Sequence, residues 1–92
     1  MKKIARRDRL KIYGDLLSIL YAESKEEKIV LTHVQVQIKV PFDRLKNYIS
    51  ELKDLGLIQD KTTLRLTEKG KEYLKEYGKV LNFMKRMGIS YQ

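Results

Sequence analysis

The sequence predicts a mainly helical α+β domain, with a core of three helices, a small β-hairpin and a long helix at the C-terminal end. Apolar residues recur at helical spacing in several segments, and two short apolar runs flank a polar turn at 59–62. The length of 92 residues suits one domain, and 42% hydrophobic with 35% charged residues is typical of a folded, soluble chain. We therefore expect one compact unit, with residues 1–66 as the binding domain and 67–92 as the last helix.

The first helix is predicted from Asp8 onward, because Asp is a favoured N-cap residue. Its apolar positions follow i, i+3, i+4 and i+7 spacing. They are Leu10, Tyr13, Leu16, Leu17, Leu20 and Tyr21. A polar stretch at 23–28 reads as a loop, and the aliphatic run 29–31 predicts one short strand.

The second helix is predicted from Thr32 to about Lys39, because Thr32 and Gln35 have the spacing of a capping box. The segment 34–38 also alternates with period two, as a strand would, and we prefer the helix because of this pair. Pro41 suits the first position of a third helix, which Gly56 ends. Its apolar face is Leu45, Tyr48, Ile49, Leu52 and Leu55.

The hairpin is predicted from Leu57-Ile58 and the run 63–66, two strands around a four-residue turn. Thr67 is then placed as the cap of a fourth helix that extends to about Met87. The predicted order is thus helix, short strand, helix, helix, hairpin and long helix.

This order, together with two local segments, resembles winged helix-turn-helix proteins. The segment 48–58, YISELKDLGLI, joins the third helix directly to the first strand of the wing, and 66–70, LTEKG, closes the wing. The chain is most similar to the crenarchaeal ten-a family of archaeal chromatin and transcription-regulator proteins. The resemblance implies double-stranded DNA binding and dimerisation through the C-terminal helix. Here that helix is shorter than in the family and contains Gly78, so a more compact dimer is expected, parallel or antiparallel.

The charge pattern favours a polyanionic partner. Lysine and arginine number 20 against 12 acidic residues, a net charge of +8, with the excess concentrated at residues 1–9 and 75–86. A basic chain rich in Lys and Glu and without cysteine also suits a thermophilic protein with surface ion pairs.

Several function classes are excluded or disfavoured. The chain has no cysteine and a single histidine, His33, so neither a disulfide framework nor a Cys/His metal site is expected. No phosphate-binding glycine loop, nucleophile elbow or spaced acidic cluster occurs. We expect no enzyme activity, no cofactor, no metal and no membrane span, and a cytoplasmic, nucleoid-associated location.

Candidate DNA contacts come from three regions. The third helix resembles a recognition helix, whose exposed face reads base edges. The wing and a basic N-terminal arm are expected to neutralise phosphates. The residues are Arg44, Lys46, Asn47 and Ser50 on the helix; Lys61, Thr62, Thr63 and Arg65 on the wing; and Lys2, Lys3, Arg6 and Arg7 on the arm. The alternative for each region is a solvated, ion-paired surface.

The fourth helix carries more apolar surface than docking onto three helices requires, so a homodimer interface is expected there. Leu74, Tyr77, Leu81 and Met84 follow the a/d spacing of a coiled coil, and Tyr73, Val80 and Met87 lie alongside. The alternative is a helix folded back entirely onto the first helix.

Two other functions remain open from the sequence. Winged helices also serve as protein–protein interaction modules, which would require an apolar patch on the third helix or wing. RNA binding would require exposed aromatic residues for stacking, and Phe42 and Tyr91 are the candidates. The target sequence, an effector and the genes affected are not determined by the sequence.

Overall fold

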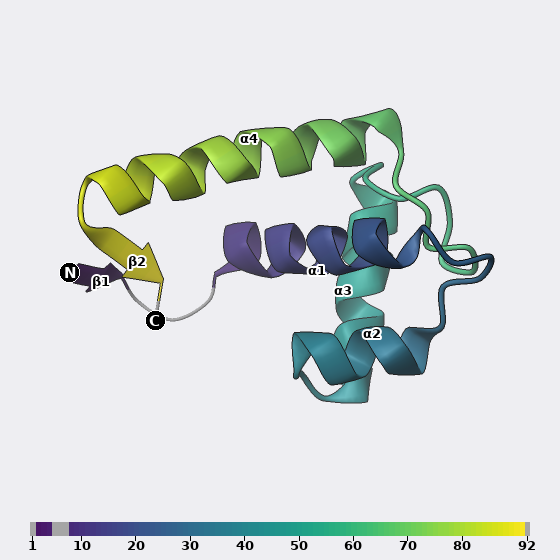
Figure 1. The fold of residues 1–92 in the computed structure, drawn as a ribbon. Helices are drawn as coiled ribbons and strands as arrows, with labels where there is room; N and C mark the ends of the chain where they lie inside the picture. The colour runs from purple at the N-terminus through teal and green to yellow at the C-terminus, as the bar shows by residue number, and fades with distance from the viewer. Residues whose placement is uncertain (1, 5–7, 92) are drawn as a thin grey trace.

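The computed structural model describes residues 2–4 and 8–91, which form four helices and two short strands. Helices α1 (Arg9–Glu23), α2 (Leu31–Ile38) and α3 (Phe42–Asp54) make the core. Helix α4 (Glu68–Arg86) runs back along α1 in the opposite direction (Figure 1). The predicted four-helix order is confirmed.

The core is formed where α1, α2, α3 and the segment after α3 meet. The central positions of the predicted apolar stripes are buried and supply most of the apolar burial that stabilises the fold. Leu10 and Tyr21, which were predicted on the stripe of the first helix, are instead 40% and 53% exposed. The most completely buried side chains are Leu16, Leu17, Leu20, Val34, Ile38, Leu45, Leu52 and Ile58.

Three of the predicted helix ends have the expected local chemistry. The carboxylate of Asp8 accepts a hydrogen bond from the Lys11 backbone N–H at 3.0 Å, and the Thr67 hydroxyl accepts one from the Gly70 N–H at 3.1 Å. Gly56 follows α3 with φ +76°, a conformation that glycine adopts at little cost.

The capping box at Thr32 was a wrong prediction. Helix α2 begins one residue earlier, with Val30 as an extended N-cap that makes no side-chain cap bond. The Gln35 side-chain amide donates instead to the Val40 carbonyl at 2.8 Å, so it closes the turn between α2 and α3. That turn also places Lys39 in the left-handed region, with φ 58°.

The strand predicted at 29–31 does not form. Ile29 is buried in an extended segment without strand pairing, and Leu31 is already helical. The wing is reduced as well, because a single antiparallel bridge joins Ile58 to Leu66. Two backbone bonds frame it, from Gln59 N–H to the Arg65 carbonyl at 2.8 Å and from Thr67 N–H to the Leu57 carbonyl at 3.1 Å. Such short segments cannot sustain a ladder without further strands.

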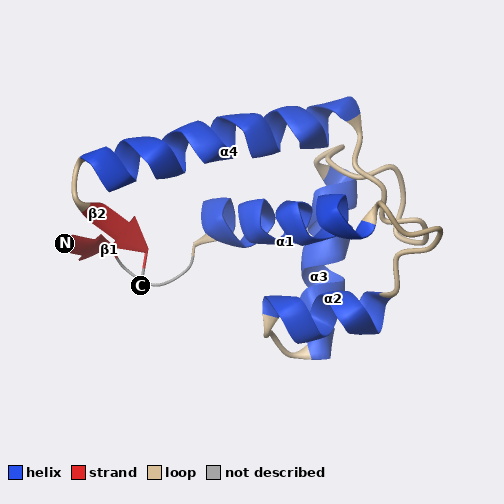
Figure 2. Cartoon of the chain, in the orientation of Figure 1, coloured by secondary structure: helices blue, strands red, loops and turns tan. Residues whose placement is uncertain are grey.

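A small sheet that was not predicted joins the two ends of the chain. Strand β1 (Lys2–Ile4) pairs in parallel with β2 (Ile89–Tyr91), with Lys2 opposite Ile89 and Lys3 opposite Ser90. Both strands lie beyond the C-terminal end of α4 and away from α3 (Figure 2).

Candidate nucleic-acid interface

Helix α3 has one buried and one exposed face. Leu45, Ile49 and Leu52 are buried, whereas Arg44, Lys46 and Asn47 are exposed and Ser50 is half-buried. Leu55, which we had assigned to the apolar face, is 43% exposed at the C-cap. The hydrogen-bonding side chains of α3 are therefore accessible to a partner along the side that does not pack on α1.

Glu51, in the last turn of α3, is neutralised by α1. The carboxylate of Glu51 lies 3.0 Å from the Arg9 guanidinium and accepts a hydrogen bond from the Tyr13 hydroxyl. Burial, and then the nearby Glu51 carboxylate, raise the pKa of Tyr13. The cluster fixes the orientation of α3 on α1 and reduces the negative potential that Glu51 would present to a phosphate.

The structure brings Lys61 of the wing close to α3. Lys46, Ser50 and Lys61 surround one shallow pocket of about 200 Å³, whose floor is Leu31 and Ile49. Among the residues that the structure describes, neither lysine forms an ion pair with a carboxylate. Two ammonium groups and a hydroxyl can therefore approach the same phosphate segment.

The wing tip is organised by Asp60. Its carboxylate accepts hydrogen bonds from the backbone N–H groups of Thr62 at 2.8 Å and Thr63 at 2.6 Å, and from the Thr63 hydroxyl at 3.1 Å. These bonds, first the one from the Thr63 N–H, hold the pKa of Asp60 below its ordinary value of 3.8. The tip is thus a defined turn that presents Lys61. The Thr63 hydroxyl donates to Asp60, so it already has a hydrogen-bond acceptor within the turn.

Arg65 has a different environment from the one expected for a phosphate contact. Its guanidinium donates to the carbonyl of Ser24 at 2.6 Å and to those of Glu26 and Glu27, each at 3.0 Å. Together with Thr62 and Thr63 it lines a second pocket, beside the loop between α1 and α2. Arg65 therefore anchors the wing to this loop.

The basic arm divides into described and undescribed residues. Lys2 and Lys3 lie in β1, whose backbone pairs with β2, at the far end of α1 from the wing (Figure 1). Arg6 and Arg7 lie outside the described residues. The structure consequently separates the backbone of Lys2 and Lys3 from the pocket that Lys46 and Lys61 share.

Phe42 is a candidate residue that the sequence reading weighed only for RNA stacking. It is the first residue of α3 and is 44% exposed, and the Lys46 ammonium lies 6.0 Å from the centre of its ring. The i, i+4 spacing of Phe42 and Lys46 was a signal that could have linked them.

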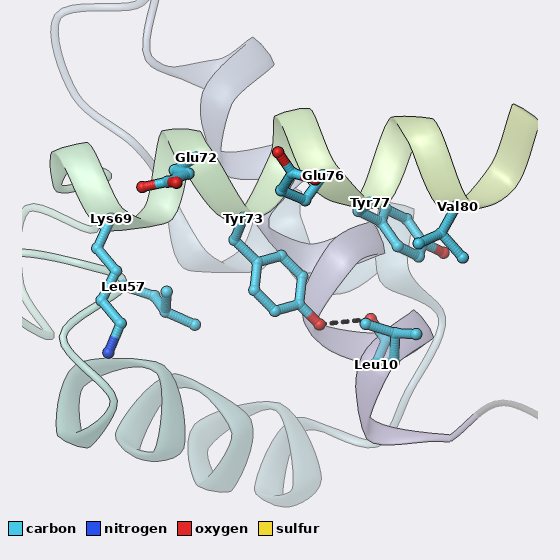
Figure 3. A pocket seen from close by; sticks show the side chains of 8 residues that line it. All are labelled: Leu10, Leu57, Lys69, Glu72, Tyr73, Glu76, Tyr77 and Val80. Carbon is cyan, nitrogen blue, oxygen red and sulfur yellow. Dashed lines mark hydrogen bonds between the residues drawn. The ribbon is translucent and has the colours of Figure 1, made fainter.

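A second candidate surface lies between α1 and α4. An apolar groove of about 340 Å³ is walled by Leu10, Leu57, Tyr73, Tyr77 and Val80, with Lys69, Glu72 and Glu76 at its edge (Figure 3). The Tyr73 hydroxyl donates to the Leu10 carbonyl at 2.8 Å, which ties the two helices together.

The predicted coiled-coil positions divide between the inside and the outside of this chain. Tyr77 and Met84 are buried within it, and the Tyr77 ring packs over Gly14 of α1. Tyr73 and Leu74 are half-buried. Val80, Leu81 and Met87 are exposed, and so is Phe83, at 51%, which the prediction had not included. The helix folds back on α1 through one side and leaves a second apolar side uncovered.

The comparison with protein families matches residues 6–85 to the winged helix-turn-helix model. The chain belongs to the winged helix-turn-helix family. Membership of this family indicates a role in DNA binding or regulation, and winged helix-turn-helix domains are typically not enzymes. Neither the curated proteins nor the solved structures gave a match.

Within residues 2–4 and 8–91, no three His, Asp or Glu side chains gather as metal ligands would. No helix in the described part of the chain has the length and hydropathy needed to cross a membrane.

Proposed function

We propose that this winged helix-turn-helix protein binds double-stranded DNA as a homodimer and acts as a chromatin-associated protein or transcriptional regulator. The observation that carries the proposal is the pocket shared by Lys46, Ser50 and Lys61, because it joins α3 and the wing into one cationic surface. An archaeal, heat-adapted source and association with the nucleoid belong to the same proposal.

In this proposal α3 enters the major groove with its exposed face. Arg44 and Asn47 are three residues apart and therefore share one face of the helix, clear of its buried stripe. Arginine can bond guanine O6 and N7 together, and asparagine can do the same with adenine N6 and N7. Lys46 and Lys61 contact the phosphates on either side, and the Arg65 anchor sets the position of the wing.

Dimerisation uses the uncovered side of α4. Val80, Phe83 and Met87 are each at least 37% exposed and lie on one side of the helix. This apolar side continues into the groove lined by Leu10 and Tyr73. Water contact with so many large apolar groups is unfavourable, and a second copy would remove it.

The protein–protein and RNA alternatives have less support. On the exposed face of α3 and at the wing tip, arginine, lysine, asparagine and threonine predominate, and Phe42 is the single exposed aromatic residue between 42 and 65. A protein-docking face would be more apolar at its centre, and an RNA-stacking surface would carry several aromatic rings.

Titrations of duplex DNA test the proposal. Wild-type protein and the variants Arg44→Ala, Asn47→Ala and Lys61→Ala are titrated at one salt concentration with an enriched duplex pool and with random duplex. Loss of a bidentate base contact should cost about 1–3 kcal/mol on the enriched pool and much less on random DNA. Lys61→Ala should weaken both equally, because phosphates carry no sequence information.

Lys75→Ala, on the exposed side of α4, is the matched control and should leave both affinities unchanged. Absence of binding to either duplex at low salt would overturn the proposed function. Altered discrimination in Lys61→Ala, with none in Arg44→Ala or Asn47→Ala, would move base reading from α3 to the wing.

A further inference from the structure

The first turn of α3 contains an exposed aromatic side chain that lies outside the buried core. Phe42 precedes the buried stripe of Leu45, Ile49 and Leu52, and 44% of its surface remains in contact with water. Exposure of a large ring is unfavourable for the isolated protein unless a partner covers it. Its position at the N-terminal end of α3 is the part of a recognition helix that meets base edges.

The neighbouring charges determine what this turn can approach. A helix N-terminus ordinarily attracts phosphate, but Asp43 stands in the first turn of α3 and is exposed. Its carboxylate repels phosphate at this point. The Lys46 ammonium, 6.0 Å from the Phe42 ring, lies on the flank where the helix faces the shared pocket. The turn is therefore suited to the space between the two phosphate backbones, with Lys46 on the flank that faces the shared pocket.

In the major groove, the thymine C5-methyl is the apolar group that a base pair presents, and phenylalanine is one of the side chains that contact it. We propose that Phe42 reads thymine by packing its ring on this methyl group. The inference rests on the proposed DNA binding and adds the base class that one residue recognises.

The test removes the methyl group and nothing else from the DNA. A duplex pool enriched on the wild-type protein is amplified once with dTTP and once with dUTP, and the affinity of each pool is measured at fixed salt. Uracil pairs like thymine but lacks the C5-methyl. Wild-type protein should bind the dUTP pool about four-fold more weakly for each methyl covered, as expected for one buried CH₂ group.

Variants of α3 test whether Phe42 causes the difference in affinity between the two pools. Phe42→Ala should bind both pools equally, and Phe42→Leu, which keeps an apolar surface, should retain part of the difference. Leu55→Ala is the matched control, because Leu55 is 43% exposed at the opposite end of α3 and should leave the four-fold difference intact. Circular dichroism and thermal melting of each variant verify the fold.

Three distinguishable outcomes would contradict thymine reading, its assignment to Phe42, or DNA binding itself. Equal binding of the two pools by wild-type protein refutes thymine reading while leaving DNA binding in place. A difference that persists in Phe42→Ala assigns the effect to another residue or to DNA shape. Failure to bind either pool refutes the proposed function itself.

Discussion

At the scale of single residues, the structure gives several side chains a task that their residue type alone does not reveal. Arg65 satisfies three carbonyl groups of the loop between α1 and α2, and Glu51 is held by Arg9 and Tyr13. From the sequence, Arg65 was a candidate DNA contact on the wing, and Glu51 was an ordinary charged residue. Their contacts span 38 residues or more along the chain, so local pattern could not reveal them.

Gly14 of α1 and Gly78 of α4 should respond oppositely to alanine. A Cβ on Gly14 would lie 2.3 Å from the buried Tyr77 ring, whereas a Cβ on Gly78 would meet nothing within 4 Å. Gly78→Ala should raise the free energy of unfolding by about 1 kcal/mol, the difference in helix propensity. Gly14→Ala should lower it by up to about 2 kcal/mol, because overpacking outweighs that gain.

Urea denaturation of Gly14→Ala and Gly78→Ala measures the two changes in the free energy of unfolding. If both alanines stabilise to the same extent, α4 does not pack tightly over Gly14, and the contact between Tyr77 and α1 is not maintained in solution. Ring-current shifts of Gly14 in the NMR spectrum provide an independent measurement.

The wing tip should lose its turn in acid. Because the pKa of Asp60 is held below 3.8, its contribution to the turn is complete above that ordinary value and is lost as the pH falls through the lowered one. The amide NMR shifts of Thr62 and Thr63, followed from about pH 6 to about pH 2, should move with a midpoint below 3.8.

Asp60→Asn keeps an oxygen acceptor and should abolish this titration while leaving the turn formed. A midpoint at or above 3.8 in the wild-type protein would contradict the hydrogen bonds that Asp60 accepts from the two threonines.

At the scale of elements, α4 has two apolar sides, of which only one packs against its own chain. One side, with Tyr77 and Met84, is covered by its own chain, and the other, with Val80 and Phe83, is not. A coiled-coil spacing of 74, 77, 81 and 84 does not distinguish the two, because it reports apolar periodicity and not the identity of the partner.

The uncovered side predicts which substitutions separate the subunits. Val80→Asp with Phe83→Asp should give a monomer of about 10.9 kDa that keeps its helix content, because neither side chain is buried. Met84→Asp is unsuitable for this purpose, since it would place a carboxylate in the chain's own core. Sedimentation equilibrium of the wild-type protein should give twice the chain mass.

Lys71→Asp, exposed and on the opposite side of the same helix from Val80, is the control and should remain dimeric. A wild-type monomer at concentrations of tens of micromolar would refute dimerisation through α4.

At the scale of the whole molecule, the two regions proposed to contact phosphates lie apart. One holds the lysines of α3 and the wing that line a common pocket, and the other is the end where β1 pairs with β2. A DNA duplex that contacts both would release more counterions than one that contacts α3 and the wing alone.

Salt dependence measures the contribution of the arm. Lys2→Ala with Lys3→Ala leaves the backbone pairing of β1 available, since that pairing needs no side chain. For each lysine that contacts a phosphate, the slope of log K against log salt should fall by about 0.9. Lys71→Ala with Lys75→Ala removes the same charge from α4 and is the control. An unchanged slope in the arm variant would show that Lys2 and Lys3 contact no phosphate.

The helices were the predictable part of this fold. Asp8, Thr67 and Gly56 act through bonds or backbone angles within a few residues, and the apolar stripes repeat at 3.6 residues, so both signals are local. The strand at 29–31 and the full hairpin were wrong because strands need partners, and the described residues supply only the bridge from Ile58 to Leu66. The candidate recognition residues of α3 followed from their place outside the apolar stripe.

The sequence by itself determined four helices, the central buried positions of the first three and a basic chain, because periodicity, capping and charge are properties of neighbouring residues. Only the tertiary structure decided that Lys61 joins Lys46 and Ser50, that Arg65 anchors the wing, and that the chain ends pair as β1 and β2. It also decided which side of α4 is left uncovered. Each of these depends on contacts between residues distant in the chain, and such contacts follow from packing in three dimensions and leave no local pattern.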